Sequence, residues 1–343
     1  MSYDPQATSH LAPPPPPPMG GSGAGEHRVG QAAEVFDRLV TNMATVVQGK
    51  TDVIRQAAIC LMAEGHLLIE DVPGTAKTTL ARALAGSLGL VWNRIQFTPD
   101  LLPSDVTGSA IYNQKTAEFE FRPGAVFANV VLGDEINRAS PKTQSALLEV
   151  MEEGTVTTDA ARYPVPKPFM VVATQNPVDM EGTYPLPEAQ LDRFLLRISM
   201  GYPSAEAEAS ILRTQRDGEP MAALHPVVSV HELNKAIEEI HRIEVAPAIE
   251  QYIVALARYT RDAEDVELGV SPRGSLALLR AARAAAAVAG RAYVIPEDVK
   301  SMAPLAWPHR MLLLPEAAVQ KRTTTEVVAR ALQQVPVPRA LPS

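Results

Sequence analysis

The chain has 343 residues, a length that suits about two domains of ordinary size. Hydrophobic residues make up 46% and charged residues 20% of the chain, which is normal for a soluble globular protein. The net charge is −8 and there is no Lys/Arg cluster, which argues against a sequence-independent nucleic-acid binder because phosphate contacts supply most of that affinity.

Residues 1–28 are expected to form a disordered tail. The proline run Pro13–Pro18 and the Gly/Ser-rich stretch after it cannot bury a core, and a solvated tail is favoured over a ligand for a proline-reading module. There is no secretory signal pattern and no stretch apolar enough to span a membrane, so we expect a cytoplasmic protein. The single cysteine, Cys60, is expected to be a buried small hydrophobe.

Residues 29–200 alternate short apolar runs with helical patterns, which is typical of a parallel α/β sheet. Several of these runs end in polar residues, and open sheets of this kind bind ligands just past the carboxyl ends of their strands. The expected strands are residues 66–70, 91–97, 130–133, 169–174 and 195–198.

The same region contains a helix with readable ends and two insertions. Ser140 and Pro141 supply an N-cap followed by proline at the first helical position, and Gly154 closes the helix. Residues 98–124 and 154–166 do not fit a minimal sheet-and-helix unit. Turn residues between β-prone pairs predict a hairpin in each of them.

Residues 201–335 are rich in Ala, Glu, Arg and Leu and have helical periodicity with few strand signals. Ser271 and Pro272 again supply an N-cap followed by proline, and the helix that they start is expected to run to Gly290. We therefore predict a second, all-α domain of several helices, followed by a short tail at residues 336–343.

A segment with the features of a phosphate-binding loop lies between the first strand and the helix expected at Leu80–Leu88. Backbone N–H groups of such a loop and of the helix N-terminus point at the anion, and the helix dipole favours negative charge there. Lys77 is expected to reach the β- and γ-phosphates of ATP, and the Thr78 hydroxyl to bind Mg²⁺. The loop residues are Asp71, Val72, Pro73, Gly74, Thr75, Ala76, Lys77, Thr78 and Thr79.

The loop departs from the strict pattern, because Asp71 and Ala76 stand where glycine is usual. Gly74 supplies the one position at which unusual backbone dihedrals are freely accessible. Ala76 adds only a methyl group and is tolerable if its φ angle is ordinary. Taken alone, the loop leaves open a simple strand–turn–helix unit with a surface lysine.

An acidic pair, Asp134 and Glu135, follows the apolar strand at residues 130–133. Adjacent residues on a strand point to opposite sides, so the two carboxylates can have different roles at its end. Asp134 is expected to hold the Mg²⁺ shell, and Glu135 to polarise the water that attacks the γ-phosphorus. A solvated pair of acids is the alternative, and it is far less favoured beside the phosphate loop.

Five stretches carry a resemblance to a known family. They are QFTPDLLPSD at 96–105, DEINRASPKTQSALLE at 134–149, ATQNP at 173–177, PEAQLDRF at 187–194 and SPR at 271–273. With them the chain resembles the MoxR family of AAA+ ATPases over about residues 30–335. The resemblance implies an α/β P-loop NTPase core with a parallel five-stranded sheet, a C-terminal all-α lid, and Mg²⁺-dependent hydrolysis of ATP. An alanine before the loop lysine is common in this family.

The resemblance also implies roles position by position. Asn176 resembles the sensor 1 residue that helps to hold the attacking water, and Arg273 resembles sensor 2. Arg193 resembles the arginine finger that reaches a neighbouring subunit's γ-phosphate, and Arg138 is a rival candidate for that role. A guanidinium suits these roles because it donates two hydrogen bonds to phosphoryl oxygens.

A finger that acts in trans makes a lone subunit slow, so the resemblance implies a homo-oligomeric ring, a hexamer. The insertions at residues 98–124 and 154–166 resemble the helix-2 and pre-sensor-1 hairpins of the clade that includes magnesium chelatase. The leading interpretation is a chaperone-like ATPase that remodels or matures a protein client. A separate partner with a von Willebrand factor A (VWA) domain is expected.

Other functions stay open at this stage. The clade permits a DNA helicase or loader, but the charge balance and the lack of a recognisable DNA-binding module disfavour nucleic acid as a partner. A metal-chelatase motor subunit would need a large porphyrin-binding partner. A nucleotide-dependent scaffold would bind ATP without hydrolysing it.

Overall fold

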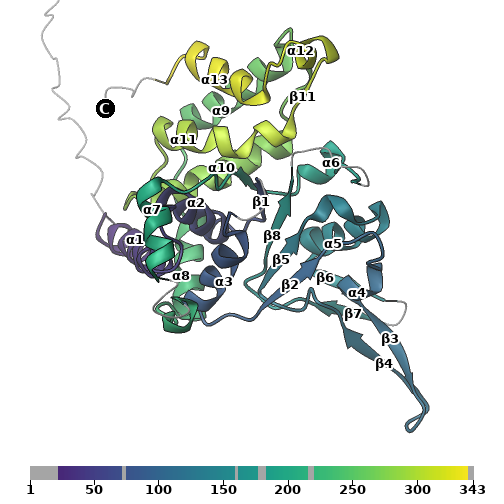
Figure 1. Cartoon of the computed structure of the whole chain (residues 1–343). Helices are drawn as coiled ribbons and strands as arrows, with labels where there is room; N and C mark the ends of the chain where they lie inside the picture. The colour runs from purple at the N-terminus through teal and green to yellow at the C-terminus, as the bar shows by residue number, and fades with distance from the viewer. Residues whose placement is uncertain (1–21, 72–74, 159–160, 177–182, 215–219, 339–343) are drawn as a thin grey trace, which may run out of the picture.

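A computed structural model describes residues 22–71, 75–158, 161–176, 183–214 and 220–338. Its centre is a five-stranded sheet with the strand order β2-β5-β8-β1-β9, in which every neighbouring pair is parallel (Figure 1). The strands are β1 (Leu67–Glu70), β2 (Trp92–Gln96), β5 (Val130–Asp134), β8 (Met170–Gln175) and β9 (Leu196–Ile198). The predicted parallel five-stranded sheet is confirmed.

Successive strand residues point to opposite faces of the sheet, so each strand contributes to two cores. Leu67 and Ile69 of β1 lie in one core with residues of three helices of the sheet region and of helices of the C-terminal region, and Leu68 lies in the other core with residues of α5. The helices are α1 (Ser22–Ala44), α2 (Thr51–Met62) and α3 (Lys77–Ser87) on the first face and α5 (Pro141–Glu153) on the second. A fully buried aliphatic side chain contributes roughly 1.5–3 kcal/mol, which explains why the central strands β1, β5 and β8 are mostly apolar. The edge strand β2 buries only Ile95.

The N-terminal helix α1 begins at Ser22, inside the segment that the sequence analysis assigned to the tail. The preceding residues 1–21, which include the proline run, lie outside the described residues, as do residues 339–343. Cys60, on α2, is fully buried, and burial raises the pKa of its thiol to about 12. The expectation of an inert buried cysteine is therefore met.

Both predicted insertions contain a hairpin. The first consists of α4 (Pro103–Thr107), β3 (Gly108–Asn113) and β4 (Glu118–Pro123), and its hairpin projects from the body of the molecule (Figure 1). The second consists of β6 (Thr155–Thr157) and β7 (Arg162–Pro164). The rings of Phe121 and Tyr163 stack with centroids 4.0 Å apart, so the two hairpins support each other.

The helix ends follow the predicted chemistry. The Ser140 hydroxyl accepts a hydrogen bond from the Thr143 N–H at the start of α5, and Gly154 ends that helix in a left-handed conformation with φ 64°. In the second region the Ser271 hydroxyl accepts from the Gly274 N–H. The helix that it caps is α10, which ends at Val288, two residues before the predicted end.

The C-terminal region is helical, as predicted. Its elements are α7 (Ala205–Thr214), η2 (Pro220–Ala223), α8 (Val230–His241), α9 (Pro247–Asp262), α10 (Pro272–Val288), α11 (Pro296–Ala306), η3 (Pro308–Arg310), α12 (Pro315–Val319) and α13 (Thr324–Gln334). A short antiparallel ribbon of β10 (Val266–Leu268) and β11 (Leu312–Leu313) was not predicted, because two or three residues are too few for a recognisable alternation. None of the helices in the described ranges combines the length and the apolar character that crossing a lipid bilayer requires.

The helical region is attached to the sheet region through α1, which packs against α8 and α10 (Figure 1). Arg38 of α1 forms an ion pair of 2.9 Å with Glu232 of α8. Glu232 also accepts hydrogen bonds from the backbone N–H and the hydroxyl of Ser229, the N-cap of α8, which completes a capping box. One carboxylate therefore stabilises both the start of a helix and a contact between the two regions.

This capping box predicts a pH-dependent contribution to stability. The backbone N–H of Ser229, its hydroxyl and the Arg38 guanidinium lower the pKa of Glu232 to about 2. Because folding favours the carboxylate, its contribution is present above the ordinary pKa of 4.5 and is lost as the pH falls toward 2. Glu232→Gln should lower the unfolding temperature at pH 7 and should have less effect at each lower pH, as measured by circular dichroism.

Glu238→Gln is the matched control on the same helix, because its ion pair with Arg242 spans 3.9 Å between exposed side chains. We expect Glu238→Gln to change the free energy of unfolding by less than about 0.5 kcal/mol at both pH 7 and pH 3. A Glu232→Gln effect that is constant between pH 7 and pH 3 would contradict the assignment of the carboxylate.

Candidate active site

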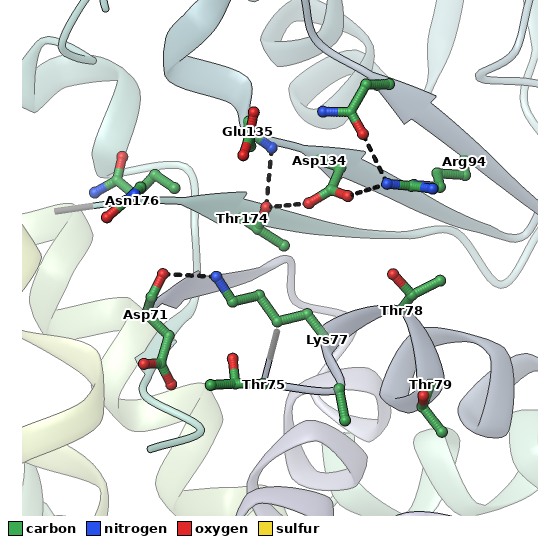
Figure 2. A pocket seen from close by; sticks show the side chains of 13 residues that line it. Asp71, Thr75, Lys77, Thr78, Thr79, Arg94, Asp134, Glu135, Thr174 and Asn176 are labelled. Atoms are coloured by element: carbon green, nitrogen blue, oxygen red, sulfur yellow. Dashed lines mark hydrogen bonds and ion pairs between the residues drawn. The ribbon is translucent and has the colours of Figure 1, made fainter. Parts of the chain in front are cut away.

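A cavity of about 430 Å³ opens at the carboxyl ends of the central strands, where the residues that follow β1 face the acidic end of β5 (Figure 2). This volume lies in the usual range for small-ligand pockets, about 300–1,000 Å³. The lining residues are Asp71, Thr75, Ala76, Lys77, Thr78, Thr79, Arg94, Gln96, Asp134, Glu135, Thr174, Gln175 and Asn176. The structure thus brings the described part of the predicted loop, the acidic pair and Asn176 together.

The loop leads directly into α3, whose first residues are Lys77, Thr78 and Thr79. The Lys77 ammonium donates a hydrogen bond of 2.7 Å to the Asp71 backbone carbonyl, across the loop (Figure 2). Burial lowers the pKa of Lys77, and the carboxylates of Asp71, Asp134 and Glu135 oppose that shift. Val72, Pro73 and Gly74, which the sequence analysis also assigned to the loop, lie outside the described residues.

Ala76, the N-cap of α3, has a left-handed backbone with φ 61° and ψ 26°. The condition of an ordinary φ, which the sequence analysis set for an alanine at this position, is therefore not met. The loop keeps the conformation that the usual glycine adopts freely, whereas a residue with a Cβ atom pays about 1–2 kcal/mol for it. Strained backbone of this kind is frequent at functional sites.

Asp71 stands where the other usual glycine would be, and its carboxylate makes hydrogen bonds that a glycine could not make. Its Oδ2 accepts a hydrogen bond of 2.5 Å from the Gly201 N–H and one of 3.4 Å from the Ser199 hydroxyl. Both donors follow β9, the strand next to β1. The aspartate side chain therefore ties the start of the loop to the edge of the sheet.

The acidic pair is held by Thr174, which is buried near the end of β8 (Figure 2). Its hydroxyl donates to Asp134 Oδ1 at 2.6 Å and accepts from the Glu135 N–H at 2.9 Å. Asp134 is the last residue of β5, and Glu135 follows in a left-handed turn with φ 55°.

Arg94, on β2, contacts the other oxygen of Asp134, with 2.6 Å between Nη2 and Oδ2. Sequence analysis identified neither Arg94 nor Thr174 as a site residue. Thr174 lies in the stretch ATQNP at 173–177, so a polar residue near that strand end was a usable signal. Arg94 gave no such signal, because only the strand order places β2 beside β5.

The three arginines predicted to act on the nucleotide lie at two different sites in the structure. Arg138, in the 3₁₀ helix η1 (Ile136–Arg138), pairs with Glu135 of its own site at 3.1 Å. Arg193, which follows α6 (Glu188–Leu191), and Arg273, on the first turn of α10, line a different cavity of about 500 Å³. The structure therefore does not bring Arg193 or Arg273 to the pocket of the same chain.

Comparison with known proteins identifies both regions. Residues 66–196 match the model of the ATPase family associated with various cellular activities (AAA), and residues 258–331 match that of the AAA lid domain. The first match contains the described pocket residues from Asp71 to Asn176, and the second contains Arg273.

Full-length relatives extend this similarity. The uncharacterized protein YeaC of Bacillus subtilis is 50% identical over 89% of this chain and 95% of its own length. Chaperone MoxR1 of Mycobacterium tuberculosis is 41% identical over 90% of this chain and 85% of its own length. The crystal structure of a proposed ATPase from Cytophaga hutchinsonii superposes with a TM-score of 0.85 at 37% identity, covering 92% of this chain and 98% of that one.

The left-handed Ala76 predicts an unusual response to glycine. Ala76→Gly should leave the free energy of unfolding unchanged or raise it by up to about 1 kcal/mol, because it removes strain but adds entropy to the unfolded chain. Ala83→Gly, inside the same helix, should lower it by at least about 1 kcal/mol. Urea-induced unfolding measures both changes, and equal destabilisation by the two substitutions would contradict the conformation of Ala76.

Proposed function

This chain belongs to the MoxR family of AAA+ ATPases, and from this premise we propose that it couples Mg²⁺-dependent ATP hydrolysis to the remodelling or maturation of a protein client. The observation that carries the proposal is the single pocket that joins Lys77 and Thr78, at the start of α3, to Asp134 and Glu135, at the end of β5. A relative with 41% identity is named a chaperone, which supports a client-directed role.

The triphosphate is proposed to lie over the N-terminus of α3. The first backbone N–H groups of a helix have no partner within it, and the helix dipole adds partial positive charge at that end. Lys77 would exchange its hydrogen bond with the Asp71 carbonyl for the β- and γ-phosphates. Thr75, Ala76 and Thr79 line the same pocket, and phosphate contacts of Val72, Pro73 and Gly74 stay a prediction.

The donor groups of the pocket fit Mg²⁺. The Asp134 carboxylate and the Thr78 hydroxyl are hard oxygen ligands, and Mg²⁺ in such sites takes one or two protein ligands together with phosphate oxygens. When bound, the ion would neutralise charge on the β- and γ-phosphates. Thr174 and Arg94 each contact one oxygen of Asp134, so the carboxylate is oriented in advance.

Glu135 is proposed as the group that polarises the attacking water. Its left-handed backbone and the hydrogen bond from its N–H to Thr174 fix where the side chain starts, which is the preorganisation that a general base needs. Asn176 lines the same pocket at the end of β8 and is proposed to orient that water.

Arg193 is proposed as the finger in preference to Arg138. Arg138 pairs with Glu135 of its own site, whereas Arg193 lies in a separate cavity and is placed to serve another subunit. AAA+ proteins are usually oligomeric, and a closed ring is the symmetric arrangement in which each subunit supplies a finger to the next. We propose a hexamer, with Arg273 also contributing to phosphate contacts.

The client is proposed to contact the projecting β3–β4 hairpin, where Ile111, Tyr112 and Phe119 are exposed. Aromatic side chains are frequent anchors of protein interfaces. A separate VWA-domain partner is proposed to assist, as the family resemblance implies.

Two substitutions separate nucleotide binding from hydrolysis. Lys77→Ala should lower ATP affinity at least tenfold, because it removes a charged phosphate contact, whereas Glu135→Gln should bind ATP normally and hydrolyse it about 10²–10⁴-fold more slowly. Fluorescent-nucleotide binding and phosphate release measure the two steps. The Glu135→Gln protein, expressed in cells, should also co-purify a protein client that Lys77→Ala does not retain.

Unchanged ATP affinity of Lys77→Ala would refute the loop assignment, and wild-type hydrolysis by Glu135→Gln would refute the general base. Salt-sensitive DNA binding without a co-purified protein would favour a helicase or loader instead.

A finger that acts in trans has a distinct signature. Arg193→Ala should bind ATP normally and lose hydrolysis by about 10³-fold or more. Mixing it with Lys77→Ala should restore part of the activity, because an Arg193→Ala subunit keeps an intact nucleotide site and a Lys77→Ala neighbour supplies an intact finger. Phosphate release from the mixture measures this, and no recovery would favour Arg138 or a cis role.

A further inference from the structure

Arg193 and Arg273, which come from different regions of the chain, meet at a single carboxylate. Glu152, one residue before the end of α5, pairs through Oε2 with Arg193 at 2.9 Å and through Oε1 with Arg273 at 3.1 Å. The Glu152 side chain is 43% exposed, so this ion-pair network lies at the surface, where a neighbouring molecule can reach it.

This cluster is separate from the nucleotide pocket of the same chain. Within the part of the chain that the structure describes, the cavity that contains Arg193, Glu152 and Arg273 shares no lining residue with that pocket. The same cavity is also lined by Arg280, Arg283 and Arg310, so it carries an excess of positive charge that favours an anionic group.

The backbone on either side of Arg193 is fixed by Arg310, a buried residue of η3. The Arg310 guanidinium donates to the Asp192 carboxylate at 2.6 Å and to the Phe194 and Leu195 carbonyls at 2.6 and 3.1 Å. This network determines where the Arg193 side chain starts. Among the residues that the structure describes, the guanidinium of Arg193 forms its ion pair with Glu152.

Glu152 also offsets the repulsion between the two guanidinium groups. Two guanidinium groups held close together repel each other, and a carboxylate between them offsets that repulsion while its two oxygens fix both directions. Arginine side chains are long and flexible, so without an anchor each would have to be ordered when phosphate arrives. The carboxylate therefore preorganises the pair.

The helix α5 also connects Glu152 to the acidic pair of the same subunit. The helix starts at Pro141, a few residues after Asp134 and Glu135, and ends at the arginine pair. Its 13 residues correspond to a rod of about 20 Å. One rigid element thus runs from the subunit's own acidic pair to the arginines that are proposed to serve the next subunit.

We propose that Glu152 is a positioning residue that holds Arg193 and Arg273 as a pair, aimed at the nucleotide phosphates of the neighbouring subunit. The proposal rests on the trans role of Arg193 proposed above. It assigns to Glu152 no contact with ATP of its own subunit.

The test compares Glu152→Ala with Glu153→Ala, the exposed neighbour on the same helix. Glu152→Ala should lower kcat by about 10- to 100-fold, the cost of misplacing a catalytic group by about 1 Å, and should leave nucleotide affinity and KM within about twofold. Glu153→Ala should leave kcat within about twofold. Glu152→Asp, which keeps the charge on a shorter side chain, should recover part of the lost kcat. Thermal unfolding should show that all three variants are folded.

Mixing of variant subunits then shows whether Glu152 acts on the nucleotide site of its own subunit or on that of the neighbouring subunit. Glu152→Ala mixed with Lys77→Ala should regain activity, because the Lys77→Ala subunit keeps its Glu152 and offers a correctly held arginine pair to the intact site of its neighbour. Reduced kcat without recovery on mixing would overturn the proposal and indicate a structural or cis role. Equal kcat for Glu152→Ala and Glu153→Ala would overturn it as well.

These outcomes are distinguishable from failure of the proposed function. If Arg193→Ala loses hydrolysis while Glu152→Ala does not, only the positioning role fails. If Arg193→Ala itself hydrolyses ATP at the wild-type rate, the finger assignment fails first.

Discussion

The parallel pairing of β1, β5 and β8 is the constraint on which the site depends. Parallel strands end at the same edge of a sheet, so the loop after β1, the acidic end of β5 and the polar end of β8 meet there. The Thr174 hydroxyl links β8 to both members of the acidic pair, and it can do so only in this register. Burial of apolar side chains on both faces keeps the strands in place.

Two residues with side chains depart from ordinary backbone geometry at this edge. Ala76 is the N-cap of α3 and Glu135 follows β5, and both have left-handed φ angles. Such conformations persist when the surrounding structure determines them, and here each lies at a junction between a strand-end segment and a helix. The strain is thus located where the phosphate loop and the acidic pair face each other.

The residues proposed to act on the nucleotide line two separate cavities. The groups proposed to bind and activate the triphosphate lie in one pocket, whereas Arg193 and Arg273 lie in another, where contacts from the helical region and from α5 hold them. A change in the position of the helical region would move the backbone around Arg193 through Arg310. Hydrogen bonds from Arg310 therefore connect the helical region to the backbone around the proposed finger within one chain.

The sequence by itself determined what depends on neighbouring residues: the apolar runs of β1, β5 and β8, the Ser-Pro starts of α5 and α10, and the loop and acidic motifs. It could not give the contacts of Arg94 with Asp134, of Arg310 with Asp192 or of Glu152 with Arg273, which join residues 40, 118 and 121 positions apart. Those contacts follow from strand order and from the packing of the helical region, which local propensity does not encode. The left-handed Ala76 also escaped prediction, because the tertiary structure imposes a conformation that alanine on its own disfavours.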